Sequence, residues 1–225
     1  ARYFPEQVEA WLRLAAVQHA RVAEIELLRL MTAASTLVTH GQLLGTTPDV
    51  LASLDQACAG IVSVNRLSRN FPLRWVFPQW LYNQMRADEA RRIPGGSSPD
   101  ERYAISEAQI NSWLAARSIV ATPIMDGPSG QVFGRQGDAP MIGWPSTAIT
   151  WLYPDGSHLF LDGGELNLGL FRDSTLVSTN DVQIFAETCE GHAFHGVESW
   201  QLTLDTCPSG EISGTVDIDP CTTGS

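Results

Sequence analysis

The stretch EQVEAWLRLAAVQHARVAEIELLRLMTAAS, residues 6–35, contains neither glycine nor proline and predicts one long helix that opens behind Pro5. At 1.5 Å per residue, this helix would be a rod roughly 45 Å long. Apolar residues lie on one face of its first half, whereas Leu27, Leu28 and Met31 help to surround its second half. A helix with this pattern must contact more than its own domain, or end buried deep within it.

The block that follows is mostly helical. Helices are expected over 47–64 and over 75–92, the second interrupted at Pro78, and a Ser-x-x-Gln capping box predicts a third over 106–117. Between the last two, the stretch 93–101 (IPGGSSPDE) is predicted to be a flexible loop by its composition.

From Ser118 onward the pattern changes to that of strands. Pro154-Asp155-Gly156 predicts a tight hairpin between two of them, and 126–145 is a long loop rich in glycine and proline. A long helix, a helical block and then strands predict an α+β fold with two lobes. The expected strands are IVATPI, TAITWLY, SHLFLD, LNLGLF, VQIFAET, SWQLTLD and ISGTVDI.

Composition limits the classes of function. The 225 residues carry a formal net charge of -11, and all 14 basic residues are arginine. Neutralising nucleic-acid phosphates needs a basic face, so sequence-specific DNA binding is not expected as the main activity. An acidic wall would instead keep a packaged polyanion from sticking to it. No stretch approaches the ~20 apolar residues that cross a bilayer, so no membrane partner is expected.

The one cluster that resembles a chemical site is Cys189, His192 and His195, whose thiolate and imidazoles are possible zinc ligands. Their spacing distributes them over both faces of a strand or around a helix, which favours ordinary loop polar groups. The pairs Asp88-Glu89 and Arg91-Arg92 are predicted to form a solvated helix face and not acid/base machinery. The sequence also contains no phosphate-binding loop, dinucleotide motif or G-x-S-x-G nucleophile elbow. We therefore expect no enzyme activity, cofactor or metal.

The four cysteines show no C-x-x-C spacing. Cys58 lies in an apolar helical pattern, which predicts a reduced thiol in the core. Cys189, Cys207 and Cys221 fall in the strand-rich part, and free thiols are favoured there over a Cys207–Cys221 disulfide.

The most specific pattern lies within 161–220. There LNLGLFRDS (166–174), STND (178–181), FAETCEGHAFHGVES (185–199) and CPSG (207–210) resemble the C-terminal region of major capsid proteins of tailed actinobacterial phages. That group is similar in fold to the shell protein of phage Hong Kong 97. The resemblance covers about the last quarter of the chain in motif, and most of the chain in the order of its elements.

The resemblance implies three regions. Residues 1–41 would be the spine helix of a peripheral domain, 42–145 an axial domain with helices and strands, and 146–225 the strand-rich return to the peripheral domain. The family has an N-terminal arm and an extended loop before the spine helix, whereas this sequence opens almost on the helix. The chain is therefore expected to be part of a longer, processed subunit or a truncated form. Without lysine, it cannot supply the lysine of a Lys–Asn isopeptide cross-link.

The implied function is that of a major capsid protein. It would assemble with itself into pentamers and hexamers of an icosahedral shell around double-stranded DNA, in the host bacterial cytoplasm, and reside in the virion. Portal, scaffold or decoration proteins are the further partners implied. The alternatives are an encapsulin-like compartment shell, a zinc or thiol enzyme built on Cys189, His192 and His195, and a head-decoration or tail protein.

Subunit-interface residues are expected on the long helix and in the family-like segment. Arg172 is expected to form a salt bridge, with Glu187 or Glu190 as its acidic partner. The full set of candidate interface residues is Trp11, Leu27, Leu28, Met31, Arg172, Asp173, Asn180, Asp181, Glu187 and Glu190.

Overall fold

The computed structural model describes residues 5–40, 46–93, 98–125, 143–171, 183–196 and 198–206, together with a few positions between 127 and 140. Over these residues the fold is α+β, as predicted. The elements are α1 (Pro5–Ala33), β1 (Thr36–His40), α2 (Thr46–Val64), β2 (Leu73–Pro78), α3 (Gln79–Arg92), α4 (Pro99–Ala116), β3 (Ile119–Ile124), β4 (Arg135–Gln136), β5 (Ala139–Pro140), β6 (Thr147–Pro154), β7 (His158–Phe171), β8 (Gln183–Phe194) and β9 (Trp200–Asp205).

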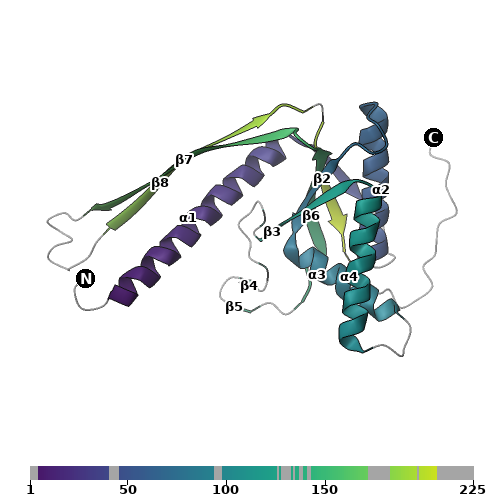
Figure 1. Ribbon diagram of the computed structural model, residues 1–225, viewed down its shortest axis with the longest axis horizontal. Helices are drawn as coiled ribbons and strands as arrows, with labels where there is room; N and C mark the ends of the chain where they lie inside the picture. The colour runs from purple at the N-terminus through teal and green to yellow at the C-terminus, as the bar shows by residue number, and fades with distance from the viewer. Residues whose placement is uncertain are drawn as a thin grey trace.

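A mixed five-stranded sheet in the order β1-β9-β6-β2-β3 forms the centre of the molecule (Figure 1). Strand β6 runs antiparallel to both of its neighbours, whereas the pairs β1–β9 and β2–β3 are parallel. The sheet takes strands from all three expected regions: β1 from 1–41, β2 and β3 from 42–145, and β6 and β9 from 146–225. Pairing between distant strands therefore unites these regions in one sheet.

The two faces of this sheet carry different hydrophobic clusters, because successive side chains of a strand point to opposite sides. One face, with Trp75, Phe77 and Leu152, packs against α2, α3 and α4. The other face, with Val76 and Trp151, packs against the end of α1. We call the sheet with α2, α3 and α4 the core.

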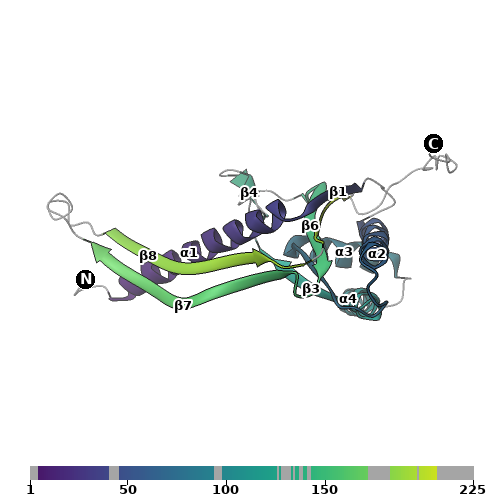
Figure 2. The ribbon, with the colours of Figure 1, turned by 90° about the horizontal axis from the view of Figure 1, so that it is seen from above.

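A second unit, which we call the arm, consists of α1 and the antiparallel ribbon β7–β8 and extends away from the core (Figures 1 and 2). The ribbon strands are 14 and 12 residues long, with a bulge between Asp162 and Leu166. Helix α1 lies along the ribbon, and His19 Nε2 is 3.0 Å from Thr188 Oγ1 of β8. The last turns of α1, the first residues of β7 and the segment between β8 and β9 connect the arm to the core.

Several predicted boundaries are wrong where tertiary contacts override local pattern. The long helix ends at Ala33, and Thr36–His40 is a strand because it pairs in parallel with β9. Residues 75–78 are part of β2 and not of a helix, since their side chains are buried in the sheet. Helix α4 begins in the expected loop: Ser98 Oγ accepts from Glu101 N at 3.2 Å, and Glu101 Oε2 accepts from Ser98 N at 2.8 Å. The capping box is therefore at Ser98, and Ser106 lies inside the helix.

The hairpin predicted at Pro154-Asp155-Gly156 is also wrong, although a turn is present. Ser157 N donates to Pro154 O at 3.1 Å, and Gly156 adopts φ +85°, which favours glycine. The strands on either side do not pair with each other, because β6 belongs to the central sheet and β7 pairs with β8. This turn instead leads the chain from the core into the arm. The expected strand ISGTVDI lies outside the described residues.

Asp88 is buried, which corrects its prediction as part of a solvated face. The carboxylate of this α3 residue is 2% exposed and accepts from Thr47 N at the start of α2, at 2.8 Å. A carboxylate at this end of a helix satisfies a free N–H group and complements the helix dipole. Arg92, 3.4 Å away, adds a charge partner. Asp88 thus joins α2 to α3.

Replacing Asp88 by alanine is expected to lower the free energy of unfolding by about 2–4 kcal/mol, because Thr47 N and Arg92 both lose their acceptor. Asp88→Asn keeps an acceptor oxygen and should lose less. Glu89→Ala, at the neighbouring position, should change the free energy by less than about 0.5 kcal/mol. Urea unfolding of the three variants measures the difference, and equal losses at positions 88 and 89 would contradict the helix-joining role.

Candidate functional site

Most of the exposed large apolar side chains in the described part of the chain lie on the arm. Trp11 is 45% exposed on α1, and Leu161 and Phe185 are 63% and 56% exposed on the ribbon. A two-stranded ribbon is marginally stable by itself and needs another surface to pack against. Exposed apolar side chains that gather on one unit of a fold in this way indicate an interaction site. Further exposed apolar residues of the arm are Leu12, Leu14, Val17, Val22, Leu30, Leu159, Phe160 and Phe194.

The ribbon has two distinct faces. Its inner face, with His158, Phe160 and His192, is directed toward α1 and borders a cavity of about 460 Å³ that Leu27 and Phe160 help to line. Its outer face carries Leu159, Leu161 and Phe185. On the outer face, the Phe185 ring lies over Gly169 of the paired strand, where an added Cβ would come within 1.9 Å of the ring. The glycine of the LNLGLF motif therefore lets an aromatic ring lie across the ribbon.

A chain of four polar side chains joins the arm to the core. His192 Nε2 lies 2.8 Å from His158 Nδ1, and His158 Nε2 lies 3.0 Å from Ser199 Oγ. Ser199 Oγ lies 2.7 Å from Ser35 Oγ, which donates to Met31 O at 2.6 Å. This chain of polar side chains thus links both ribbon strands, the start of β9 and the last turn of α1.

The positions of the protons along these four side chains follow from the last acceptor, the backbone carbonyl of Met31. The carbonyl of Met31 only accepts, so the Ser35 hydroxyl donates to it and accepts from Ser199. Ser199 must then accept from His158 Nε2–H, which leaves His158 Nδ1 to accept from His192 Nε2–H. Every member of the chain is satisfied when both histidines are neutral.

The environment favours those neutral forms. Burial, and then the neighbouring His192, lower the pKa of His158 to about 4. Burial also lowers the pKa of His192. Tyr153, whose ring meets the His158 ring edge-on at 4.5 Å, has a pKa raised by burial to about 12 and stays neutral.

The predicted interface residues lie in different surroundings, some buried, some exposed and some outside the described residues. Leu28 and Met31, predicted as subunit-interface residues, are 3% and 2% exposed against the central sheet, where they attach α1 to the core within one chain. Leu27 is half-buried, whereas Trp11, Glu187 and Glu190 are exposed on the arm and remain interface predictions. Four further candidates lie outside the described residues: Arg172, Asp173, Asn180 and Asp181.

The structure separates the three residues that were considered as alternative zinc ligands. Cys189 is exposed, His192 bonds to His158, and His195 is exposed beyond the end of β8. Among the described residues, no three His, Cys, Asp or Glu side chains converge as metal ligands would. The polar chain includes His158 and Ser199, which sequence reasoning missed, because only the register of β7 with β8 places them beside His192.

The core thiol was predicted correctly. Cys58 is a free cysteine, 8% exposed, and burial raises its pKa to about 12. Cys189 is a free, exposed cysteine. Cys207 and Cys221 lie outside the described residues.

No known family model matches this chain, and no curated protein matches it. Its function must therefore be inferred from its own residues and geometry. Within the described ranges, no helix has both the length and the apolar character to span a membrane.

Proposed function

We propose that this chain is a major capsid protein, the subunit of an icosahedral phage head that encloses double-stranded DNA. The observation that carries the proposal is the arm, which extends from a well-packed core and presents apolar side chains to solvent on α1 and on both ribbon strands. An arm of this kind is stabilised when a neighbouring subunit covers it.

The arrangement of elements supports the same proposal. The long helix precedes a unit of helices on a sheet, and the strands of the family-like segment return along that helix (Figure 2). This is the order that the resemblance of residues 161–220 implies for the spine helix, axial domain and peripheral strands. The net charge of -11 suits a wall that must not bind its packaged polyanion.

Shell formation is tested on the expressed chain and on native particles by light scattering and electron microscopy. Closed particles of megadalton mass are expected for the wild type. Leu161→Glu places a charge on the outer face of the ribbon and should abolish these particles while leaving the unfolding free energy within about 0.5 kcal/mol. Leu161→Met, which keeps an apolar side chain, should still assemble.

The outcomes separate the possible classes. A wild-type protein that stays monomeric or dimeric under every assembly condition would refute the capsid proposal. Particles that contain a cargo protein in place of DNA would assign the chain to an encapsulin-like compartment. Normal particles from Leu161→Glu would show that the outer face of the ribbon is not an interface.

A further inference from the structure

Two arginines at the end of α2 stand apart from the other described arginines. Arg66 and Arg69 are exposed and have no ion pair with any residue that the structure describes. This is unusual in a chain with 25 acidic and 14 basic residues, where carboxylates are in excess. The described arginines that do pair with carboxylates include Arg13, Arg29, Arg74, Arg86, Arg92 and Arg117.

Arg66 also occupies a backbone position that favours glycine. Leu67 N donates to Val62 O at 3.0 Å and Arg66 N to Ser63 O at 3.3 Å, which is the Schellman pattern at a helix C-terminus. Arg66 is the left-handed residue of this motif, with φ 49°. A side chain with a Cβ destabilises this conformation, so its presence points to a role outside the folding of the chain.

The matching charges lie on the arm. Asp162 of β7 and Glu190 of β8 are directly opposite each other in the ribbon, and both are exposed. Like charges at opposed positions of paired strands repel each other, and a cation between them would relieve this repulsion. Glu187, also exposed, lies three residues before Glu190 on the same strand. None of the three forms an ion pair within the described part of the chain.

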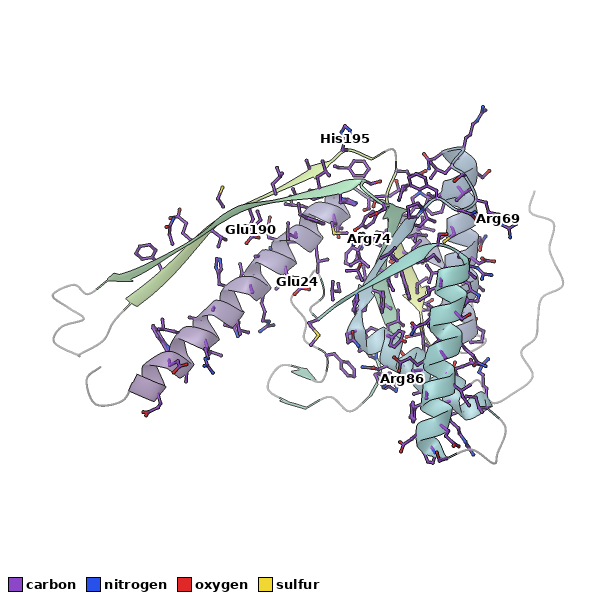
Figure 3. All side chains as sticks on the ribbon, in the orientation of Figure 1. Glu24, Arg69, Arg74, Arg86, Glu190 and His195 are labelled. Atoms are coloured by element: carbon purple, nitrogen blue, oxygen red, sulfur yellow. The ribbon has the colours of Figure 1, made fainter. Side chains whose placement is uncertain are left out.

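The two arginines and the carboxylates of the arm cannot meet within one molecule. Glu190 lies midway along the arm, whereas Arg69 lies beside α2 on the far side of the core, well separated along the long axis (Figure 3). A contact between them requires two copies in a head-to-tail arrangement, and such contacts generate closed rings when the rotation closes.

We propose that Arg66 and Arg69 of one subunit bind the carboxylates of Asp162 and Glu190 on the arm of a second copy of this chain. Apolar residues flank both groups: Val64 is 67% exposed beside the arginines, and Phe160, two residues before Asp162 on the same face of the ribbon, is 49% exposed. The proposal rests on the proposed shell function and deepens it by naming one contact of the ring. Guanidinium groups bind carboxylates and phosphates alike, and the exposed carboxylate pair on the same chain favours a second copy as the partner.

The test is a charge-reversal cycle in the full chain, read as the fraction of assembled protein in sedimentation. Arg66→Glu/Arg69→Glu and Asp162→Arg/Glu190→Arg should each lower this fraction about ten-fold or more, and the combination of all four changes should restore it. Arg66→Lys/Arg69→Lys keeps the charge and should assemble. Arg66→Gly should assemble poorly yet unfold at a higher urea concentration than the wild type, because glycine relieves the left-handed strain.

Each result has a distinct meaning. If the wild type assembles and both reversed pairs assemble equally well, this contact is wrong while the shell proposal stands. If the four-fold variant fails although each double variant is folded, the two groups do not face each other. Arg66→Glu/Arg69→Glu particles that form normally but lose DNA would assign the arginines to nucleic acid and overturn the contact. A wild type that never assembles overturns both proposals.

Discussion

Trp151→Ala should lower the free energy of unfolding of the unassembled protein by about 3–5 kcal/mol. Trp151 is fully buried between the central sheet and the last turns of α1, where it packs with Leu28, Met31 and Tyr153. Its removal leaves a large cavity at the place where the arm is attached. Urea unfolding monitored by circular dichroism measures the loss.

Two further variants make this result specific. The Trp151 Nε1 atom has no hydrogen-bond partner in the described structure, so Trp151→Phe loses buried side-chain volume but no hydrogen bond. It should lower the free energy of unfolding by about 1–2 kcal/mol. Trp11→Ala applies the same truncation to a ring that is 45% exposed on the free part of the arm. It should change stability by less than about 0.5 kcal/mol and act on assembly instead. Comparable losses at Trp11 and Trp151 would contradict the attachment of α1 through its end alone.

Acidification should weaken the fold through His158. The pKa of His158 is about 4 in the folded chain, because of burial and the neighbouring His192. The unfolded chain returns this pKa to about 6.5. Below about pH 6.5, His158 binds a proton in the unfolded state but stays neutral in the folded state. The free energy of unfolding therefore falls from about pH 6.5 downward, and the loss is nearly complete at about pH 4. The expected loss is about 3 kcal/mol at about pH 4, and the lowered pKa of His192 acts in the same direction.

The measurement compares urea unfolding at about pH 7.5 and about pH 4.5 in the wild type and in His158→Gln. Because glutamine does not titrate, the variant should lose about 2–3 kcal/mol less than the wild type between the two pH values. Its absolute stability at neutral pH does not enter the comparison. His195→Gln, at an exposed histidine beyond the end of β8, should retain the wild-type pH dependence. A dependence unchanged in His158→Gln would remove the polar chain as its source.

The elements that could be read from sequence are those with strong local patterns. The helix 6–35, the helix 47–64 and the strands 119–124, 147–153 and 199–205 appear close to their expected positions, because periodicity is a property of neighbouring residues. The two strands expected over 157–162 and 166–171 are instead the single strand β7, and the strand expected over 182–188 continues to Phe194. The segment 75–78 was assigned to the wrong element: its aromatic and β-branched residues suit either state, and pairing with β3 and β6 selects the strand.

The site was harder to predict than the fold. Cys189, His192 and His195 stood out because they are close in sequence, yet their side chains lie in different surroundings. His158 and Ser199 carry no local signal of their own. Their partners are 34 and 164 residues away along the chain, so only the assembled ribbon and sheet reveal the polar chain.

Residue type and short spacing were enough to specify the α+β class, the long helix, the core thiol of Cys58 and the acidic, lysine-free composition. Long-range contacts were needed for the rest: β1 joins β9, the Pro154–Gly156 turn leads from the sheet into the arm, and Leu28 and Met31 are core while Trp11 is exposed. Strand pairing and burial depend on residues far apart in the chain, and local patterns do not encode which of them will meet.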